Sequence, residues 1–241
     1  MGSTPIPPPM ATPFIAIFLD ETTSTQDEAR SRFTGEPVLV AANRQTAGRG
    51  RRDNEWENAD RLVAASLAFR PEWDADDWSV LTLVAGLAAV DVLGPAVGLD
   101  WPNDLVTPDG KVGGILAESD GTAVTVGMGV NLHWGRPMPG AAAIHAADPG
   151  SEEVERVART WANRLLTRAS GESADWGRAE YVAACSTIGH DVTWEPEGAG
   201  RATGIAPDGG LEVDTADGPT IIRSGEVHTV RAIPPPLSPL R

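Results

Sequence analysis

Residues 97–132 read "VGLDWPNDLVTPDGKVGGILAESDGTAVTVGMGVNL" and carry the clearest structural pattern in the chain. Apolar segments in this stretch are separated by "WPND" and "TPDG", and Pro, Asn, Asp and Gly are the residues that tight turns favour. Between and after these turns, "KVGGILAE" and "AVTVGMGVNL" have the apolar character of strands. We therefore expect a series of strands joined by tight turns.

The strands of this stretch hold several glycines. Glycine weakens a strand, so repeated glycine marks a bulge or a place where a ligand or another backbone comes close. Glycines recur in three segments, "AGRGR" (47–51), "KVGGIL" (111–116) and "VGMGVN" (126–131). We expect these three segments to form the walls of one pocket.

Strand and helix patterns alternate in the rest of the first 190 residues or so. Ser24 or Thr25 can cap the first helix, because a side-chain oxygen there can accept from the backbone of the first turn, which holds Asp27 and Glu28. We expect strands at 14–20, 36–45 and 61–71, and helices from Ser24 or Thr25 onward and at 76–94, 151–170 and 176–189.

The pattern changes from His190 onward. Short strands recur at a spacing of about ten residues, with Gly and Asp between them, which is typical of a small β-barrel. We place a domain boundary near Ile188. The two ends of the chain, 1–11 and 235–241, are rich in proline and are expected to be flexible tails.

Composition limits the classes of function. The chain has 241 residues and a formal net charge of −15, and such an acidic protein is a poor partner for nucleic acid. No apolar run approaches the roughly 20 residues that a membrane span needs, and the first residues do not resemble a secretory signal. Cys185 is the only cysteine, which fits the reducing cytoplasm and excludes a cysteine-built metal site.

Lys111 is the only lysine, against eighteen arginines. An ammonium is a compact point charge whereas a guanidinium is a planar fork, so the two differ where one cation must contact one oxygen. One interpretation is therefore that Lys111 is kept as a point charge for one ligand oxygen; the alternative is that one lysine remains by chance. The residues around Lys111 have to decide between these two interpretations. The segment "GRGRR" (48–52) places three cations in five residues, which indicates either a site for a small anion or a solvated basic loop.

Six motifs occur in an order that resembles the biotin protein ligases. They are "STQDEAR", "RQTAGRGRRDNEW", "LDWPNDLV", "GKVGGILAE", "VGMGVNL" and "SGEVHTVR", and the resemblance covers about residues 14–233. The resemblance is to short, monofunctional members, and we expect no DNA-binding domain before the first strand. It implies an α+β fold: a mixed, largely antiparallel sheet with flanking helices (12–187), followed by an SH3-like β-barrel (188–234).

The resemblance also implies a reaction in two steps. Biotin and ATP form biotinyl-5′-AMP and pyrophosphate, with Mg²⁺ as cofactor, and a lysine of a biotin carboxyl carrier domain of an acyl-CoA carboxylase then takes the biotin. A lipoate or octanoate ligase is the alternative enzyme, which "GRGRR" and the C-terminal barrel disfavour. A protein that binds biotin without turnover is the second alternative. The sequence leaves a monomer and a homodimer equally open, and indicates no metal-binding cluster.

Site residues follow from the resemblance, motif by motif. Lys111, Arg51 and Asp104 are the expected catalytic residues, with a turn-forming role as the alternative for Asp104. The adenylate would contact Arg49, Arg51, Trp56, Asn103, Lys111 and Asn131; core packing is the rival role for Trp56, and a turn for Asn131. Biotin would contact Ser24, Thr25, Gln26, Gln45, Arg49, Gly50, Arg51, Lys111, Gly113 and Gly114.

Three residues depart from the family pattern. Asp100 stands where a basic residue usually precedes "WPND", and Asn54 stands where the Gly-Arg loop commonly has an arginine. Gln26 replaces the asparagine of a Ser-Thr-Asn segment, which is a mild chemical change. The first two changes remove cations from around the phosphates, so they bear on rate and nucleotide affinity.

Overall fold

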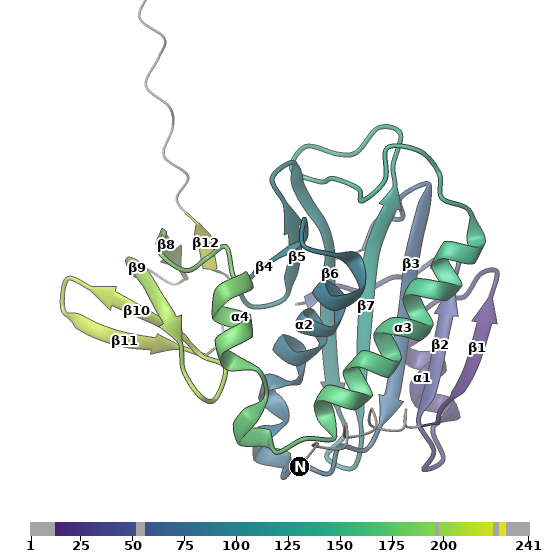
Figure 1. Ribbon diagram of the computed structural model, residues 1–241, viewed down its shortest axis with the longest axis horizontal. Coiled ribbons are helices and arrows are strands. Elements are labelled where there is room, and N and C mark those ends of the chain that lie inside the picture. The colour runs from purple at the N-terminus through teal and green to yellow at the C-terminus, as the bar shows by residue number, and fades with distance from the viewer. Residues whose placement is uncertain (1–12, 52–55, 196–197, 224–226, 230–241) are drawn as a thin grey trace, which may run out of the picture.

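A computed structural model describes residues 13–51, 56–195, 198–223 and 227–229, which form two β-sheets and their flanking helices (Figure 1). The predicted tails 1–11 and 235–241 lie outside the described residues, and so does Asn54. No helix in the described part of the chain is both long enough and apolar enough to cross a membrane.

Seven strands form the larger sheet in the order β1-β2-β3-β7-β6-β5-β4. The pair β1–β2 is parallel and the other neighbours are antiparallel, so the sheet is mixed and largely antiparallel, as expected. The bounds are β1 Ile15–Leu19, β2 Val38–Ala42, β3 Arg61–Phe69, β4 Gly98–Asp100, β5 Asp104–Thr107, β6 Gly110–Ser119 and β7 Val124–His133.

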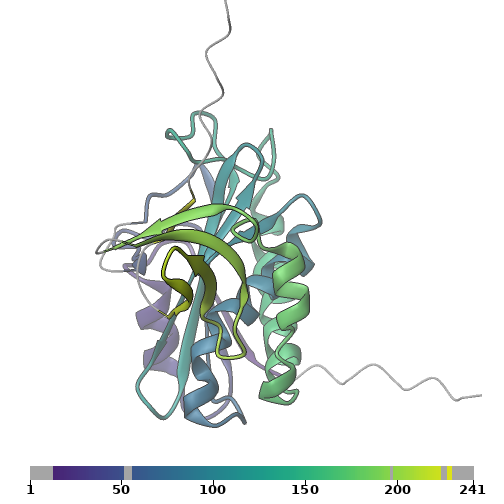
Figure 2. The same cartoon turned by 90° about the vertical axis from the view of Figure 1, so that its left-hand side faces the viewer.

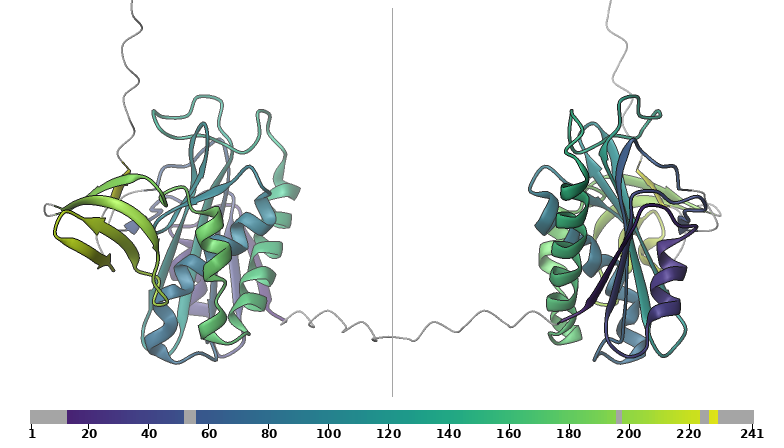
Figure 3. Two further views of the ribbon diagram at one scale, coloured as in Figure 1. Left: turned by 60° about the vertical axis from the view of Figure 1, so that its left-hand side comes forward. Right: turned by 90° about the vertical axis from the view of Figure 1, so that its right-hand side faces the viewer.

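Helices cover both faces of this sheet. The helix α1 (Thr25–Arg32) packs on one face, and α2 (Leu81–Leu93) and α3 (Ser151–Ala169) pack on the other, as Figure 3 shows. Strands covered on both faces are apolar throughout, which explains the continuous apolar run of β3. Trp161 of α3 is fully buried in this core, and its Nε1 donates to the carbonyl of Ala85 at 3.1 Å.

Two helices are shorter than their sequence patterns predict. The segment 76–94 divides into a 3₁₀ helix, η2 (Ala75–Val80), and α2, because Trp78 Nε1 donates back to the carbonyl of Trp73 and holds a tighter turn. The helix α4 (Arg178–Ala184) follows the short η3 (Ser173–Asp175) and ends early, because Ser186 donates from its backbone to the carbonyl of Leu99.

The second sheet has five antiparallel strands in the order β11-β10-β9-β8-β12. A closed barrel is not seen: in the described residues no pairing joins the edge strands β11 and β12, so this sheet is curved but open (Figure 2). The edge strand β12 has only three described residues, and all three pair with β8. The bounds are β8 Asp191–Trp194, β9 Gly198–Ile205, β10 Leu211–Thr215, β11 Gly218–Ile222 and β12 Val227–Thr229.

Tryptophans fasten the second sheet to the first. Trp101, between β4 and β5, donates from Nε1 to the carbonyl of Gly209 at 2.9 Å, and Trp176 donates to the carbonyl of Pro207 at 2.9 Å. Both acceptors lie in the turn between β9 and β10. This docking fixes the second sheet beside β4 and brings β12 to the rim of the cavity described next.

Candidate active site

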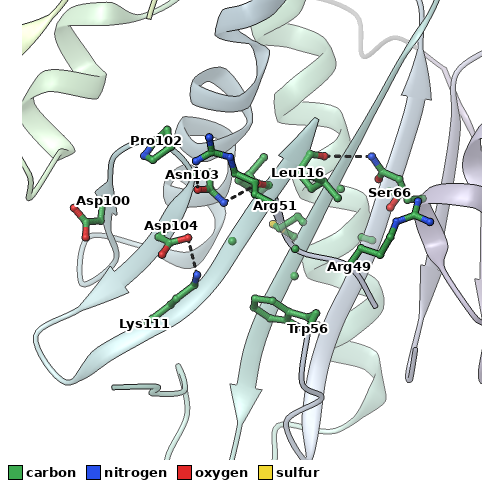
Figure 4. A pocket seen from close by; sticks show the side chains of 18 of the residues that line it. Arg49, Arg51, Trp56, Ser66, Asp100, Pro102, Asn103, Asp104, Lys111 and Leu116 are labelled. Carbon is green, nitrogen blue, oxygen red and sulfur yellow. Dashed lines mark hydrogen bonds and ion pairs between the residues drawn. The ribbon is translucent and has the colours of Figure 1, made fainter. Parts of the chain in front are cut away.

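A cavity of about 330 Å³ opens on the face of the larger sheet, with the described part of the Gly-Arg loop, residues 47–51, at its side (Figure 4). All three glycine-bearing segments line it, so the prediction that they share one pocket is confirmed. In particular, the Gly-Arg loop and Lys111 face the same space. The predicted site residues that line the cavity are Ser24, Thr25, Gln26, Gln45, Arg49, Gly50, Arg51, Trp56, Asn103, Asp104, Lys111 and Gly114.

One end of the cavity is lined by the uncharged polar side chains of Thr25, Gln26, Gln45 and Ser66, beside which Figure 4 shows Arg49. Gln45 Oε1 accepts hydrogen bonds from the backbone N–H and the hydroxyl of Thr25, at 2.8 and 3.1 Å. The Thr25 hydroxyl also lies 2.9 Å from the Ser66 hydroxyl. The Asn58 side chain accepts from the backbone N–H of Gln45 at 3.2 Å and donates to its carbonyl at 2.7 Å. These two bonds fix the backbone of Gln45. This end can recognise a neutral polar ligand group through paired hydrogen bonds.

Gln26 offers a buried acceptor at the same end. Its Nε2 donates to the carbonyls of Thr125 at 2.8 Å and Leu116 at 3.4 Å, which fixes the orientation of the amide. Its Oε1 is buried and has no hydrogen-bond partner among the described residues. A Cβ on Gly127 would lie 2.7 Å from that oxygen, so the glycine makes room for the longer side chain. A buried acceptor without a partner is costly unless a ligand supplies a donor.

Glycines form the floor of the cavity beneath Trp56. Gly114 and Gly129 are partners across β6 and β7, and the indole of Trp56 lies over them (Figure 4). A Cβ on Gly129 would lie 3.0 Å from the indole, which is tighter than ordinary contact, so glycine lets the ring lie this close to the sheet. The indole Nε1 is buried and, among the described residues, has no hydrogen-bond partner. Trp56 thus presents a flat aromatic face to the space between the two ends.

The other end is charged. Lys111 Nζ lies 2.7 Å from Asp104 Oδ1, and Figure 4 shows the two side chains pointing toward one another from β6 and β5. Burial raises the pKa of the Asp104 carboxyl above its ordinary value; the Lys111 and Arg51 charges oppose this shift, and the Asp100 carboxylate adds to it. The pair therefore concentrates an ammonium and a carboxylate in a partly dehydrated place.

The backbone on both sides holds the charged end in place. Lys111 donates from its backbone N–H to the carbonyl of Gly140 at 2.9 Å and accepts from Ala142 at 2.7 Å. Arg51 donates to Asn103 Oδ1 at 3.3 Å, and Asn103 in turn donates to the carbonyl of Ile115 at 3.1 Å. The Gly-Arg loop is thereby tied through Asn103 to the strand that carries Lys111.

Asp100 also lines this end of the cavity. It is directly opposite Asp104 in the β4–β5 pair, so two carboxylates are neighbours. The hydroxyl of Thr187 donates to Asp100 Oδ1 and accepts from the backbone N–H of Trp101 at 2.8 Å. Among the described residues, Asp100 forms no ion pair with Lys or Arg.

Two predicted site residues do not line the cavity. Gly113 packs against the neighbouring strand, where a Cβ would lie 2.5 Å from the carbonyl oxygen of Gly129. Asn131 is buried and donates to the carbonyl of Ala142 at 3.1 Å, while its Oδ1 is buried without a partner among the described residues. Their predicted ligand contacts are not visible in the geometry of this cavity.

Other residues that line the cavity were not predicted as site residues. Ser66 is polar within the otherwise apolar run of β3, and that contrast is a signal in the sequence. Val227 and His228 reach the rim from β12; they belong to the motif "SGEVHTVR", but that motif does not indicate that the docking of the second sheet brings them to the cavity. In the part of the chain that the structure describes, no three His, Cys, Asp or Glu side chains form a metal-binding group.

Comparison with known proteins gives consistent relatives. The sequence profile of the Biotin/lipoate A/B protein ligase family matches residues 15–133. The biotin–[acetyl-CoA-carboxylase] ligase of Paracoccus denitrificans is 34% identical, over 87% of this chain and 98% of the relative, and that of Mycobacterium tuberculosis is 32% identical, over 80% and 79%. The biotin protein ligase of Aquifex aeolicus, solved with biotin and ATP, superposes with a TM-score of 0.73 at 25% identity, over 90% of this chain and 99% of that one.

Proposed function

The chain belongs to the biotin protein ligases of the Biotin/lipoate A/B protein ligase family, and from this premise we propose how its cavity works. The protein is an ATP-dependent ligase that forms biotinyl-5′-AMP and transfers biotin to a lysine of a biotin carboxyl carrier domain of acetyl-CoA carboxylase. The observation that carries the proposal is the convergence of Lys111 and the Gly-Arg loop on one cavity with a neutral polar end.

Adenylation brings two anions together. The biotin carboxylate attacks the α-phosphorus of ATP, an acyl–phosphate bond forms, and pyrophosphate leaves with its bonding electrons. Fixed cations lower such a barrier most effectively where water is scarce. Lys111 supplies a point charge to the oxygen between the reacting groups, and Arg51, held by Asn103, supplies a second cation from the loop.

The neutral end suits the head group of biotin. A ureido ring has two N–H donors and one carbonyl acceptor, so it needs acceptors and a donor in fixed positions. Gln26 Oε1 is the buried acceptor without a partner, and the Ser24 and Thr25 hydroxyls together with Gln45 supply the remaining polar contacts. Arg49 and Gly50 would follow the valeryl chain, and Gly114 would let the backbone approach it. Gly113 packs against the neighbouring strand and would have no ligand contact.

The middle of the cavity would hold the nucleotide. Trp56 would cover the adenine, since its indole face is exposed to the cavity above Gly129. Asn131 donates to the carbonyl of Ala142, and its Oδ1 is buried. It would contact the adenosine only after the segment at Ala142 moved away from it. Asn103 and the catalytic Asp104 would line the phosphates, and the Asp104 carboxylate fits a nucleotide-bound Mg²⁺, which needs few protein ligands. The metal would neutralise phosphate charge.

Residues 12–187 form the catalytic domain in this proposal, and residues 188–234 form an SH3-like C-terminal domain. The second domain would act by supplying Val227 and His228 to the rim on which the carrier lysine arrives. In the transfer step the lysine amine attacks the acyl carbon, an amide forms, and AMP leaves. Either a monomer or a homodimer is compatible with this arrangement.

One assay tests the proposal. Purified protein with biotin, ATP and Mg²⁺ is expected to release pyrophosphate, and addition of a biotin carboxyl carrier domain is expected to yield a carrier heavier by one biotinyl group. Lipoate in place of biotin is the matched control and is expected to release little pyrophosphate. Pyrophosphate release without transfer to any carrier would limit the function to adenylate formation.

A further inference from the structure

Arg49 of the Gly-Arg loop forms a two-pronged ion pair outside the catalytic groups. Its two terminal nitrogens donate to the two oxygens of Asp27, at 3.0 and 2.8 Å. This fork-to-fork geometry is the strongest arrangement for an arginine and a carboxylate. The pairing with Arg49 is also the main reason that the pKa of Asp27 lies below its ordinary value.

Two further charges extend this pair into a network. Glu118 Oε2 lies 3.7 Å from Arg49, and Arg30 forms a close ion pair with the same oxygen of Glu118. Arg30 also lies 4.0 Å from Asp27. Two acids and two arginines therefore alternate, and they come from α1, from the end of β6 and from the loop. We refer to Asp27 and Glu118 as the clasp.

Both members of the clasp stand on rigid parts of the cavity. Asp27 follows Gln26, whose amide is anchored to backbone carbonyls of β6 and β7, and its own N–H donates to the Ser24 hydroxyl. Glu118 is on the same strand as Lys111. The clasp thus joins the loop to the two walls that carry the biotin-binding segment and the catalytic lysine.

The clasp is exposed enough to respond to salt. The side chains of Asp27 and Glu118 are 51% and 34% exposed, and that of Arg49 is 36% exposed. A single exposed ion pair contributes little to stability, but a bidentate pair within a network of charges contributes more, and salt weakens it. The geometry therefore suits a loop that closes firmly and still opens.

We propose that Asp27 and Glu118 are positioning residues that hold Arg49, and with it residues 47–51 of the Gly-Arg loop, against the cavity so that the adenylate is retained until a carrier arrives. This inference rests on the proposed function and adds to it a means of retention. Neither residue lines the cavity, so neither needs to contact biotin or ATP. Loss of the clasp should loosen the loop without removing a reacting group.

The test is the escape of biotinyl-AMP from the double variant Asp27→Asn, Glu118→Gln. Radiolabelled adenylate formed on the protein is expected to dissociate about three- to tenfold faster from the variant, as the loss of two exposed pairs implies. Labelling of a lysine peptide that is not a carrier should rise in step, whereas the rate of pyrophosphate release at saturating substrates should change little. The single variant Asp27→Glu keeps the charge, so it should retain the adenylate nearly as well as the wild type and much better than the double variant.

Two controls separate a clasp from a general structural effect. Glu155→Gln removes an exposed ion pair of similar kind, to Arg159 on α3, and should leave release unchanged. Raising the salt concentration should accelerate release from the wild type and have little effect on the double variant, because the variant has no clasp to screen. Equal release rates, or equal salt dependence, in the two proteins would overturn the proposal.

A second readout needs no turnover. Backbone amides of residues 47–51 should exchange hydrogen faster in the double variant than in the wild type, with no ligand present. If the wild type forms no adenylate, the proposed function fails while this measurement still tests the clasp. Unchanged exchange in the loop of a folded double variant would rule the clasp out, whatever the activity.

Discussion

The ammonium of Lys111 lies 2.7 Å from Asp104 Oδ1, so the single lysine of the chain already has a counter-ion before any substrate binds. The pair joins neighbouring strands, β6 and β5, and both backbones are held by the sheet and by the segment at Gly140. A substrate anion must therefore share or displace Asp104 to reach the ammonium. This competition makes the pair the most sensitive point of the proposed site.

Replacing Lys111 with Ala is expected to lower the rate of pyrophosphate release by at least about a hundredfold, since one group that stabilises developing charge is commonly worth that much. Lys111→Arg should recover little, because a planar guanidinium cannot place a point charge on one oxygen. Circular dichroism should show an unchanged fold in both variants. Near wild-type release by Lys111→Ala would remove the catalytic role from this residue.

The same change should alter the titration of Asp104. Burial raises its pKa and Lys111 opposes the rise, so in Lys111→Ala the carboxyl should titrate at a still higher pH. A folded-state pKa above the unfolded value means that stability is present at low pH and is lost as pH rises through the folded pKa. Relative to the wild type, the unfolding free energy of Lys111→Ala should therefore fall as pH rises from the folded-state pKa of Asp104 in the wild type to its higher folded-state pKa in the variant.

Carboxyl NMR of Asp104 measures this shift directly, and denaturant unfolding across pH measures its effect on stability. Asp104→Asn in the Lys111→Ala background is the control, because it removes the titrating group while keeping its size. The additional loss of stability with rising pH should disappear in that double variant. An unchanged Asp104 titration in Lys111→Ala would show that the two groups do not interact as their separation indicates.

Gly127→Ala is expected to weaken biotin binding. The added Cβ would lie 2.7 Å from Gln26 Oε1 and force the buried amide out of position. Overpacking of this kind costs about 1–3 kcal/mol, which corresponds to roughly a ten- to hundredfold rise in the Kd for biotin. Calorimetric titration measures it, and Gly171→Ala, where only ordinary contact would result, is the matched control.

A shorter partner should rescue that variant. Gln26→Asn withdraws the amide from Gly127, so the double variant with Gly127→Ala should bind biotin more tightly than Gly127→Ala alone. No recovery would mean that Gly127 acts on biotin through another group. The pair would then be neighbours without being coupled.

Asp100→Asn is expected to lower the KM for ATP. The variant keeps an acceptor for the Thr187 hydroxyl but removes one of two neighbouring carboxylates from the end of the cavity that would hold the phosphates. At an effective dielectric constant near that of a protein surface, one charge a few ångströms away is worth about 1 kcal/mol or more, so a several-fold change is expected. Steady-state kinetics measure it, with Asp109→Asn, in the β5–β6 turn, as a surface control.

Local chemistry explains what could be predicted from the sequence. The turns in "WPND" and "TPDG" and the glycines of β6 and β7 lie next to the strands they shape, so residues 97–132 could be read directly. Ser24 caps α1 as expected, because an N-cap depends only on residues within one helical turn. Lys111 and the Gly-Arg loop share a cavity, as their motifs predict.

Features set by distant contacts could not be predicted in this way. Val227 and His228 reach the cavity only because Trp101 and Trp176 dock the second sheet against the first. The pairing of Arg49 with Asp27 joins a loop to a helix turn and leaves no trace in either segment alone. Strand spacing predicted a barrel, but spacing does not determine whether the edge strands meet, and the second sheet is open in the described residues.

The chain should resist labelling by its own product. A reactive acyl phosphate modifies accessible amines, and the single lysine is engaged in an ion pair with Asp104 inside the cavity. Prolonged incubation with biotin and ATP, without a carrier, is therefore expected to leave every side chain unmodified in peptide mass spectrometry, with the N-terminal amine counted separately. Arg164→Lys places one lysine on the exposed face of α3 and is the positive control, since that residue should become labelled. Biotin found on Lys111 in the wild type would mean that its amine can reach the acyl carbon of the adenylate and is not committed to the ion pair.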